Sequence, residues 1–301
     1  DGLAQFGATC VSLERKGHAP FMVKGPIFAN NIEIDGEDSQ PVSALLMAAA
    51  FMEGTSEIKV RNPGELPWVN LTLSWFEKLG FSYINNNFET YKVKGGFIPK
   101  AFNYCVPGDF SSLAYPLVAA LITGAGLTIT NVDMADPQGD KYLIGALGKM
   151  GAGITYNGTN KSLTLKPTSK LKGVDLDINS YIDALPILAV AACYAHGETI
   201  LRNCAIARKK ECDRLSSISI ELGKMGAEII EEDDLLRIMG RPLKGADCLS
   251  HKDHRIAMAL TIAGLGAKGE TNIVDVGCIN KSYPGFLQDM AALGAKVGTQ
   301  L

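Results

Sequence analysis

Two patterns of hydrophobic positions recur along the chain. The first is a short helical pattern with one apolar face, which ends at a glycine and is followed by an extended segment. It occurs five times, and its glycines lie 68–75 residues apart, at Gly7, Gly80, Gly151, Gly226 and Gly294. Glycine commonly ends a helix because it adopts the left-handed conformation without strain. A unit of about 70 residues therefore repeats along the chain.

The second pattern is a helix that is apolar on every side and runs through a glycine into a strand. It recurs in residues 43–60, 115–132, 185–203 and 258–276. A helix without a polar face belongs in the interior of a protein. Together the patterns predict a unit of strand, buried helix, strand, amphipathic helix and two strands joined by a hairpin, for example through Asn85–Asn87. About four copies fit.

Such a repeat is compatible with a solenoid, but a unit this long with its own sheet and helices is more typical of a subdomain. We therefore predict an α/β fold of two globular domains assembled from such subdomains. Turn residues at Pro107 and Gly108 mark the boundary. The predicted domains are residues 1–107 and 108–301.

Composition narrows the class of protein. The chain has 301 residues, 47% of them hydrophobic, and a net charge of −3, which argues against general binding to nucleic acids or anionic membranes. The longest apolar run, residues 184–195, is too short for a bilayer crossing of about 20 residues. Seven cysteines without a C-x-x-C pair indicate a reducing cytosol and no structural zinc. The sequence opens within a repeat and without Met, so we expect a fragment.

Polar residues gather just before each buried helix, at Asp38–Gln40, Asp109–Ser112, Asn179–Asp183 and Asp253–Arg255. Repetition of the unit would place these helix starts in equivalent positions. Aspartate and serine there are most simply N-caps, whose side chains accept hydrogen bonds from the first backbone N–H groups. This accounts for Asp109 and the serines after it.

Cations at helix starts need another explanation. Arg208, Lys210 and Arg214 surround the start of one amphipathic helix, Arg255 begins a buried helix, and Lys281 opens the last helix. Each placement is unfavourable by a few tenths to about 1 kcal/mol, because a helix N-terminus carries partial positive charge. Helix N-termini together with Arg and Lys form phosphate and carboxylate sites. We therefore predict an anion that all five cations face.

Three carboxylates lie among these cations in the sequence, at Asp183, Glu211 and Asp253. Each is either a cap or ion-pair partner, or a general acid or base. His254 is either a hydrogen-bonded structural histidine or part of the same chemistry. The residues alone predict a doubly anionic ligand and proton transfer, and they name no reaction.

Four motifs then carry a resemblance. They occur in the order "GDFSSLAYPLVAAL", "RKKECDRL", "DHRIAMALTIAG" and "CINKSYPGFLQDMAALG". In this order they resemble the enolpyruvyl transferases, and among them the 5-enolpyruvylshikimate-3-phosphate synthases. The likeness runs through essentially the whole chain. It implies an inside-out α/β barrel of two domains built from βαβαββ subdomains, of which residues 1–107 would hold about one and a half.

The resemblance also implies a reaction. The enolpyruvyl group of phosphoenolpyruvate would pass to the 5-hydroxyl of shikimate 3-phosphate with release of phosphate, in a cytoplasmic, monomeric enzyme of aromatic amino acid biosynthesis that needs no metal or organic cofactor. Protonation of the methylene carbon would make an oxocarbenium-like centre that the hydroxyl attacks, and the tetrahedral adduct would lose phosphate. This chemistry needs an acid, a base and cations for two phosphates.

Roles for individual residues follow from the resemblance. Asp183 matches the carboxylate that binds the shikimate hydroxyls and is the proposed base, and Glu211 matches the proposed proton donor. Lys210 and Lys281 complete the implied catalytic set, Lys210 as a cation that serves both substrates. The other implied substrate-binding residues are Ser39, Gln40, Trp68, Arg214, Asp253, His254 and Arg255.

The chain departs from the family's pattern in places. Asp38 replaces a serine, and Glu65 stands where a phosphate-binding serine is usual. Two carboxylates facing a phosphate would repel it, so the acceptor stays open. Cys212 replaces a Ser or Thr, and Trp68 replaces a Tyr under the shikimate ring unless it only packs in the core.

Two rival functions remain open. One is enolpyruvyl transfer to another acceptor such as a UDP-sugar, and the other is a scaffold that binds an anion or a partner chain without turnover. The family also carries substrate-binding residues upstream of the first motif seen here. We therefore expect the 301-residue piece to be inactive alone.

Overall fold

The computed structural model describes residues 2–167 and 170–298. The chain divides into two compact units. The first comprises Asp1–Cys105 with Pro137–Gly139, and the second comprises Val106–Asp136 with Asp140–Leu301.

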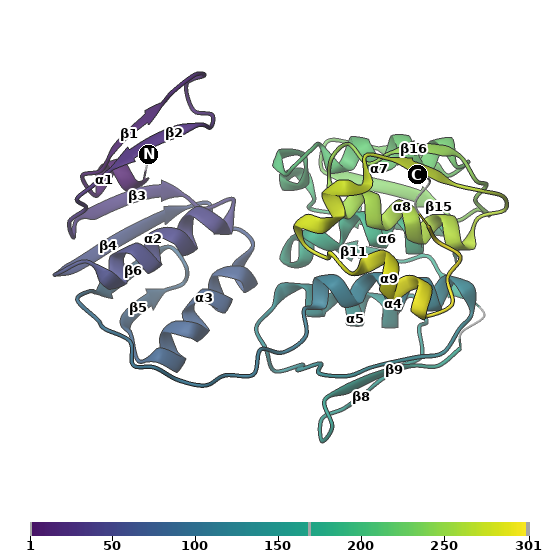
Figure 1. The fold of residues 1–301 in the computed structure, drawn as a ribbon, viewed down its shortest axis with the longest axis horizontal. Helices are drawn as coiled ribbons and strands as arrows, with labels where there is room; N and C mark the ends of the chain where they lie inside the picture. The colour runs from purple at the N-terminus through teal and green to yellow at the C-terminus, as the bar shows by residue number, and fades with distance from the viewer. Residues whose placement is uncertain (1, 168–169, 299–301) are drawn as a thin grey trace. The chain divides into compact units, whose positions relative to one another are not determined.

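The first unit contains a four-stranded sheet in the order β3 (Asn31–Asp35), β4 (Thr55–Arg61), β6 (Thr90–Lys94) and β5 (Ser82–Asn86). Strands β3 and β4 are parallel, and the other neighbours are antiparallel. Residues of β3, β4 and β6 alternate between buried and exposed, so one face of the sheet packs on the core. Helices α2 (Ser39–Phe51) and α3 (Leu66–Leu79) cover that face (Figure 1).

The same unit begins with α1 (Gly2–Gln5) and the hairpin of β1 (Thr9–Ser12) and β2 (Phe21–Lys24). The order β3, α2, β4, α3, β5, β6 is one complete predicted repeat. The turn of its hairpin lies later than expected. Its left-handed central residues are Asn87 and Phe88, and Glu89 N donates to Asn86 O at 3.0 Å.

The second unit holds three further repeats, apart from Gly139, which belongs to the first unit. The first contains α4 (Phe110–Thr123), β7 (Leu127–Ile129), the 3₁₀ helix η1 (Gly139–Lys141), α5 (Tyr142–Lys149), β8 (Ile154–Asn157) and β9 (Ser162–Leu165). The next contains β11 (Asp175–Asp177), η2 (Asn179–Ala184), α6 (Leu185–Cys193), β13 (Glu198–Arg202), η3 (Ala205–Lys209), α7 (Arg214–Lys224), β14 (Glu228–Glu231) and β15 (Leu235–Met239). The last contains β16 (Asp247–Leu249), α8 (His254–Gly266), β17 (Asn272–Val274), η4 (Val276–Lys281) and α9 (Phe286–Ala292).

The sheets of the second unit follow the same plan. Their strand orders are β7-β9-β8, β11-β13-β15-β14 and β16-β17, and a short parallel pair joins β10 (Leu171–Lys172) to β12 (Ala195–His196). Pairs β11-β13 and β16-β17 are parallel, as in the first unit. Each parallel pair is connected through one of the apolar helices.

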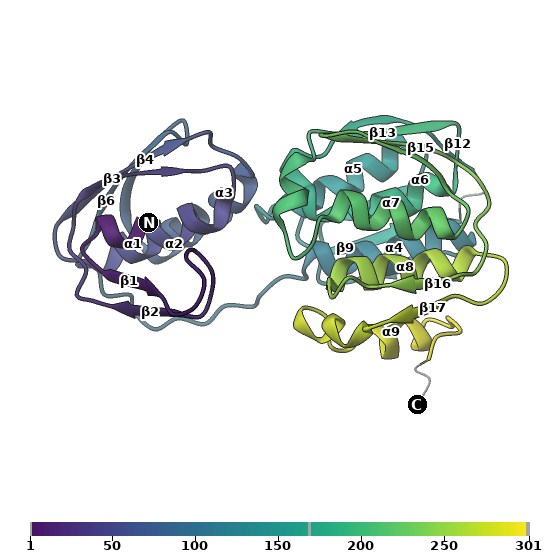
Figure 2. The same ribbon diagram turned by 90° about the horizontal axis from the view of Figure 1, so that it is seen from above.

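The predicted buried helices form the centre of the second unit. Helices α4, α6 and α8 contact one another and lie side by side in Figure 2. Every residue of α6 is buried, as expected for a helix without a polar face. The predicted α/β fold of repeated subdomains is confirmed. The central position of α4, α6 and α8 follows from their apolar sequences.

The five repeated glycines all have positive φ, between 82° and 100°. Each follows a short helix, so the repeat seen in the sequence is a repeat of helix ends. A second repeat was not recognised from the sequence. One residue close after the strand that follows each buried helix, at Asn62, Asn131, Asn203 and Asp275, has φ between 51° and 63°. Asn and Asp tolerate this conformation better than other non-glycine residues do.

The expected start of the last helix was wrong. Lys281 is the final residue of η4, and α9 begins five positions later, at Phe286. Pro284 and Gly285 lie between them. Proline disfavours a helical conformation of the residue before it, so the helix starts only after this pair.

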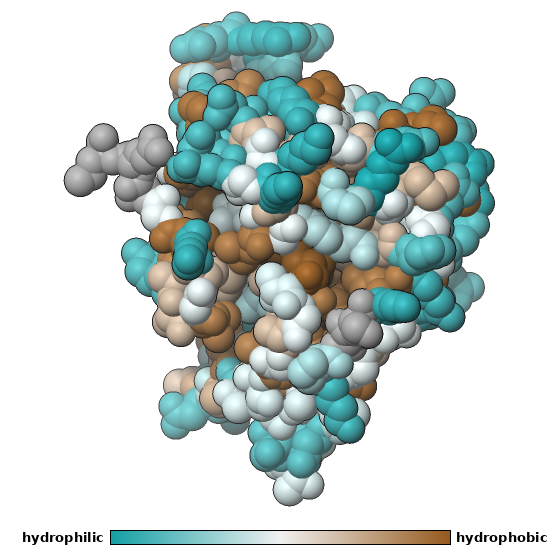
Figure 3. Space-filling view, turned by 90° about the vertical axis from the view of Figure 1, so that its right-hand side faces the viewer, coloured by the Kyte–Doolittle hydropathy of each residue, from teal (hydrophilic) through white to brown (hydrophobic). Residues whose placement is uncertain are grey.

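A hollow of about 490 Å³ lies where the C-terminal ends of α4 and α8 approach α9. Leu127, Met290 and Leu293 line it. Figure 3 shows that apolar residues gather near the centre of the face drawn there. Lys296 is the one charged residue among its described lining residues. The polar residues singled out in the sequence do not line it.

We predict that Gly226→Ala lowers the free energy of unfolding by about 1 kcal/mol, because Gly226 has φ 91° and alanine is strained there. No atom lies within 4 Å of a Cβ built at Gly226 or at Gly223. Gly223 lies inside α7, so Gly223→Ala should instead raise stability by about 0.5–1 kcal/mol. Urea unfolding of both variants checks this. Equal effects of the two substitutions would contradict the assignment.

Candidate active site

Aspartates cap the helices that carry the predicted site. Asp253 is the N-cap of α8, and its Oδ1 accepts hydrogen bonds from Arg255 N at 2.8 Å and Ile256 N at 3.4 Å. Asp38 and Asp109 do the same for α2 and α4. An aspartate at this position offsets the unfavourable effect of a cation in the first turn. Arg255, in the first turn of α8, therefore lies close to the capping carboxylate of its own helix.

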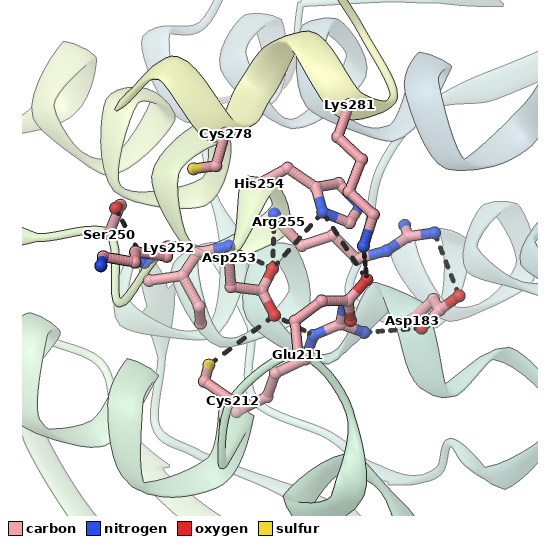
Figure 4. A network of polar contacts seen from close by, with 12 residues as sticks. Asp183, Glu211, Cys212, Ser250, Lys252, Asp253, His254, Arg255, Cys278 and Lys281 are labelled. Carbon is pink, nitrogen blue, oxygen red and sulfur yellow. Dashed lines mark hydrogen bonds and ion pairs between the residues drawn. The ribbon is translucent and has the colours of Figure 1, made fainter. Parts of the chain in front are cut away.

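Arg214 is the centre of the cluster. It is the first residue of α7 and is 1% exposed. Its Nε donates to Asp253 Oδ2 at 2.7 Å, its Nη1 to Asp183 Oδ1 at 2.7 Å and its Nη2 to Glu211 Oε2 at 2.6 Å. Three carboxylates from three segments thus share one guanidinium, and Figure 4 shows them converging.

Two further predicted cations join the same carboxylates. Arg255 Nη2 donates to the second oxygen of Asp183 at 3.0 Å. Lys281 Nζ donates to the second oxygen of Glu211 at 2.6 Å. Each of these two carboxylates therefore bridges a pair of cations, so that Arg214, Arg255 and Lys281 lie around the same two carboxylates.

Arg208 does not belong to this cluster, contrary to the expectation that five cations face one anion. Its Nη1 donates to Asp213 Oδ2 at 2.9 Å and to Glu231 Oε1 at 2.7 Å. Lys210 is the residue directly after η3, and its charge helps to lower the pKa of Asp183. Proximity in sequence did not distinguish the two side chains.

The cations keep both bridging carboxylates ionised. Burial opposes the charge of Asp183, but the charges of Arg255 and Arg214 prevail and lower its pKa. Burial likewise acts against Glu211, whose pKa is nevertheless lowered to about 2 by the hydrogen bond from Lys281 and the charge of Arg214. Glu211 is therefore ionised in this structure and carries no proton that it could donate.

His254 is buried beside the cluster. Its Nδ1 lies 3.8 Å from Asp253 Oδ1 and 3.9 Å from Glu211 Oε1, and it has no hydrogen-bond partner among the described residues. Burial and the charge of Arg255 lower its pKa. His254 is therefore neutral at pH 7 and offers a ring nitrogen next to Glu211.

The other predicted residues lie in the first unit. Ser39 is buried at the start of α2, and its N and Oγ both donate to Glu65 Oε2, at 3.1 and 3.0 Å. Gln40 is exposed one residue later, and its N donates to Asp38 Oδ1 at 2.9 Å. Trp68 is half-buried in the first turn of α3. Asp38 and Glu65 thus bind the start of α2.

Asp140 was missed by the sequence argument. It is 1% exposed, and neither of its carboxylate oxygens has a hydrogen-bond partner among the described residues. It lines a narrow crevice with Tyr115, Asp183 and Arg255. Burial raises its pKa to about 7, with the charge of Arg255 acting in the opposite direction. In the sequence, an aspartate before an amphipathic helix was indistinguishable from an N-cap.

No group of three or more His, Cys, Asp and Glu within residues 2–167 and 170–298 is arranged to hold a metal ion. In the same residues, none of the helices combines the length and apolar character of a membrane span.

Solved structures define the class first. EPSP synthase from Acinetobacter baumannii superimposes with a TM-score of 0.79 and 28% identity, covering 97% of this chain and 68% of that one. The enolpyruvyl transferase NikO from Streptomyces tendae is 20% identical with a TM-score of 0.76, over 98% of this chain and 70% of that one, which shows the fold alone. The chain has the fold of the enolpyruvyl transferases.

Sequence comparison then gives the family. The family described as "EPSP synthase (3-phosphoshikimate 1-carboxyvinyltransferase)" matches residues 1–290. A 3-phosphoshikimate 1-carboxyvinyltransferase from Chlamydia caviae is 43% identical over 98% of this chain and 66% of its own length. One from Acetivibrio thermocellus is 40% identical over 97% and 69%. The chain belongs to the EPSP synthase family, as its motifs indicated, and it spans about two thirds of these relatives.

We predict that Asp140→Asn removes a pH dependence of stability. The native state holds a proton on Asp140 up to about pH 7, whereas the unfolded chain loses it near the ordinary value of 3.8. Asp140 therefore lowers the unfolding free energy as pH rises from about 4 to about 7. The variant should gain stability over wild type progressively across this window, by a few kcal/mol in all, as measured by urea unfolding at several pH values.

Asp109→Asn is the matched control with the opposite sign. Burial opposes ionisation of Asp109, but hydrogen bonds from Ser112 and Ser111 lower its pKa. Its contribution is therefore present at neutral pH and is lost as pH falls below the ordinary value of 3.8. A difference between Asp140→Asn and wild type that does not change from pH 4 to 8 would contradict the assigned state of Asp140.

Proposed function

We propose that the protein containing this chain transfers the enolpyruvyl group of phosphoenolpyruvate to the 5-hydroxyl of shikimate 3-phosphate and releases phosphate. The observation that carries the proposal is the convergence of Arg214, Arg255 and Lys281 on two carboxylates within one unit. Family membership supports the same reaction. Phosphoenolpyruvate carries a carboxylate and a phosphate, which suit guanidinium and ammonium donors.

Asp183 is the proposed base and acceptor for the substrate hydroxyls. Its lowered pKa keeps it ionised at neutral pH, so it can accept hydrogen bonds and take the proton that leaves the attacking hydroxyl. Its two oxygens are held by different arginines, which fixes the plane of the carboxylate. The attacking oxygen would thereby meet a base of defined orientation.

Glu211 is the proposed acid, and its lowered pKa sets a condition on that role. It must bind a proton before it can give one to the methylene carbon of phosphoenolpyruvate. Lys281 and Arg214 hold its charge in this structure. A ligand anion that draws these cations to itself would raise the pKa of Glu211. Anion binding and protonation of the acid are thereby coupled.

The environment of the enzyme is part of the proposal. We infer a cytoplasmic, monomeric enzyme that acts without a metal or organic cofactor. The net charge of −3 and the absence of a C-x-x-C pair support a cytosolic protein that acts on small molecules. All seven cysteines are unpaired, which suits a reducing compartment.

The contacts of Glu65 favour a second candidate for the acceptor substrate. Its buried carboxylate already binds the N–H and hydroxyl of Ser39, the serine that the family resemblance assigns to the acceptor's phosphate. An acceptor without a phosphate at that point, including a UDP-sugar, would avoid the repulsion. Assays with both acceptors and phosphoenolpyruvate, following phosphate release by the full-length protein, distinguish the two. Phosphoenolpyruvate binding without turnover on either acceptor would favour the non-catalytic scaffold.

We predict that Lys281→Ala in the full-length protein raises the KM for phosphoenolpyruvate about 10- to 100-fold, the loss expected for one charge-assisted hydrogen bond. Lys149→Ala, at the exposed end of α5, is the control and should change nothing. Steady-state kinetics with shikimate 3-phosphate checks both variants. Unchanged kinetics of Lys281→Ala would remove Lys281 from the proposed site.

A further inference from the structure

Two side chains of helix α7 form hydrogen bonds with the segment before α8. The first is Arg214, which donates to Asp253. The second is Glu221, two turns later on the same helix face. Glu221 is 0% exposed, and its Oε2 accepts a hydrogen bond from Leu249 N at 3.0 Å, while its Oε1 lies 2.8 Å from His251 Nε2. A carboxylate only accepts, so His251 donates.

Glu221 is an ionised group. Burial opposes its charge, but the hydrogen bonds from Lys224, Leu249 N and His251 lower its pKa. Lys224 Nζ lies 2.9 and 2.8 Å from its two oxygens. A buried carboxylate with these donors holds them firmly, because leaving it unpaired would be unfavourable.

The segment that Glu221 holds is strained. His251 and Lys252 have φ of 52° and 59°, and two consecutive left-handed residues that are not glycine are unfavourable. Ser250 supports the turn, since its Oγ accepts from Lys252 N at 3.1 Å and donates to Asp275 O at 3.0 Å. Other conformations of residues 251–252 are favoured locally, so the turn depends on contacts from outside it.

The strained turn leads directly into the site. Asp253 follows it, caps α8 and accepts the hydrogen bond from Arg214. Arg255, two residues further on, reaches Asp183. Figure 4 shows this run from Ser250 and Lys252 through Asp253 to Arg255 around the carboxylates. A relaxed turn would move the cap, and with it both arginine contacts.

We propose that Glu221, with His251, is a positioning residue for the anion site, because it holds the left-handed turn at residues 251–252 and thereby sets Asp253 and Arg255. This inference rests on the proposed binding of phosphoenolpyruvate at that site. Glu221 itself touches none of the proposed catalytic side chains through its carboxylate. The competing interpretation is that Glu221 only joins neighbouring elements and stabilises the fold.

Glycine at position 252 separates the two interpretations, because glycine adopts a φ of 59° without strain. In the full-length protein, Glu221→Gln should weaken phosphoenolpyruvate binding about tenfold, as expected for loss of a charged hydrogen bond. Adding Lys252→Gly should restore most of that affinity. Glu228→Gln, the same substitution at an exposed position of β14, is the matched control and should leave the affinity within about twofold.

Titration calorimetry with phosphoenolpyruvate measures these affinities without turnover, and thermal unfolding is recorded for each variant. If the wild-type protein binds phosphoenolpyruvate but does not turn over shikimate 3-phosphate, the proposed reaction is contradicted. The binding measurements on the variants still test the positioning role in that case. Glu221→Gln with unchanged affinity, or a loss that Lys252→Gly does not restore, overturns the positioning role. If Glu221→Gln does not fold, His251→Ala replaces it, with a loss of about threefold and the same restoration expected.

Discussion

The buried guanidinium of Arg214 is the interaction on which the site depends. Removing a cation from water is unfavourable unless carboxylates and hydrogen bonds replace the water. Here Asp183, Glu211 and Asp253 each take one N–H direction of the planar group. The η2 segment, Glu211 in the link between η3 and α7, and the N-cap of α8 are thereby brought to one point. The repeated subdomain provides the helix starts, and Arg214 sets how they meet.

The cluster is balanced by charge in this structure, and that balance has a chemical consequence. The cations expected to hold an anion are paired with Asp183 and Glu211, the two carboxylates to which the proposed mechanism assigns proton transfer. A ligand anion would compete with them for the same donors. In the proposed mechanism Glu211 would become an acid only when the ligand draws these cations away from it, because its pKa depends on the cations beside it. The proposal therefore couples binding to chemistry through shared hydrogen bonds.

The sequence predicted the features that depend on local order. Repeated glycines and apolar helices have characteristic spacing, so the α/β subdomains and their central helices were recognisable. The direction in which a side chain points could not be predicted in the same way, because it depends on segments that are far apart in the chain. Arg208 and Arg214 are six residues apart, yet one binds Glu231 and the other Asp183. Asp140 was not singled out in the sequence, and only the fold shows that its buried carboxylate has no hydrogen-bond partner within residues 2–167 and 170–298.

The most direct test of the central claim compares two variants by urea unfolding at pH 7. Replacing Arg214 by Leu removes the cation that three carboxylates share and leaves the buried Asp253 without its ion pair. It should lower the unfolding free energy by about 3–5 kcal/mol. Adding Asp183→Asn and Asp253→Asn removes two of those charges and keeps a good N-cap. The account predicts that this triple variant recovers at least half of the loss. A triple variant no more stable than Arg214→Leu would contradict it.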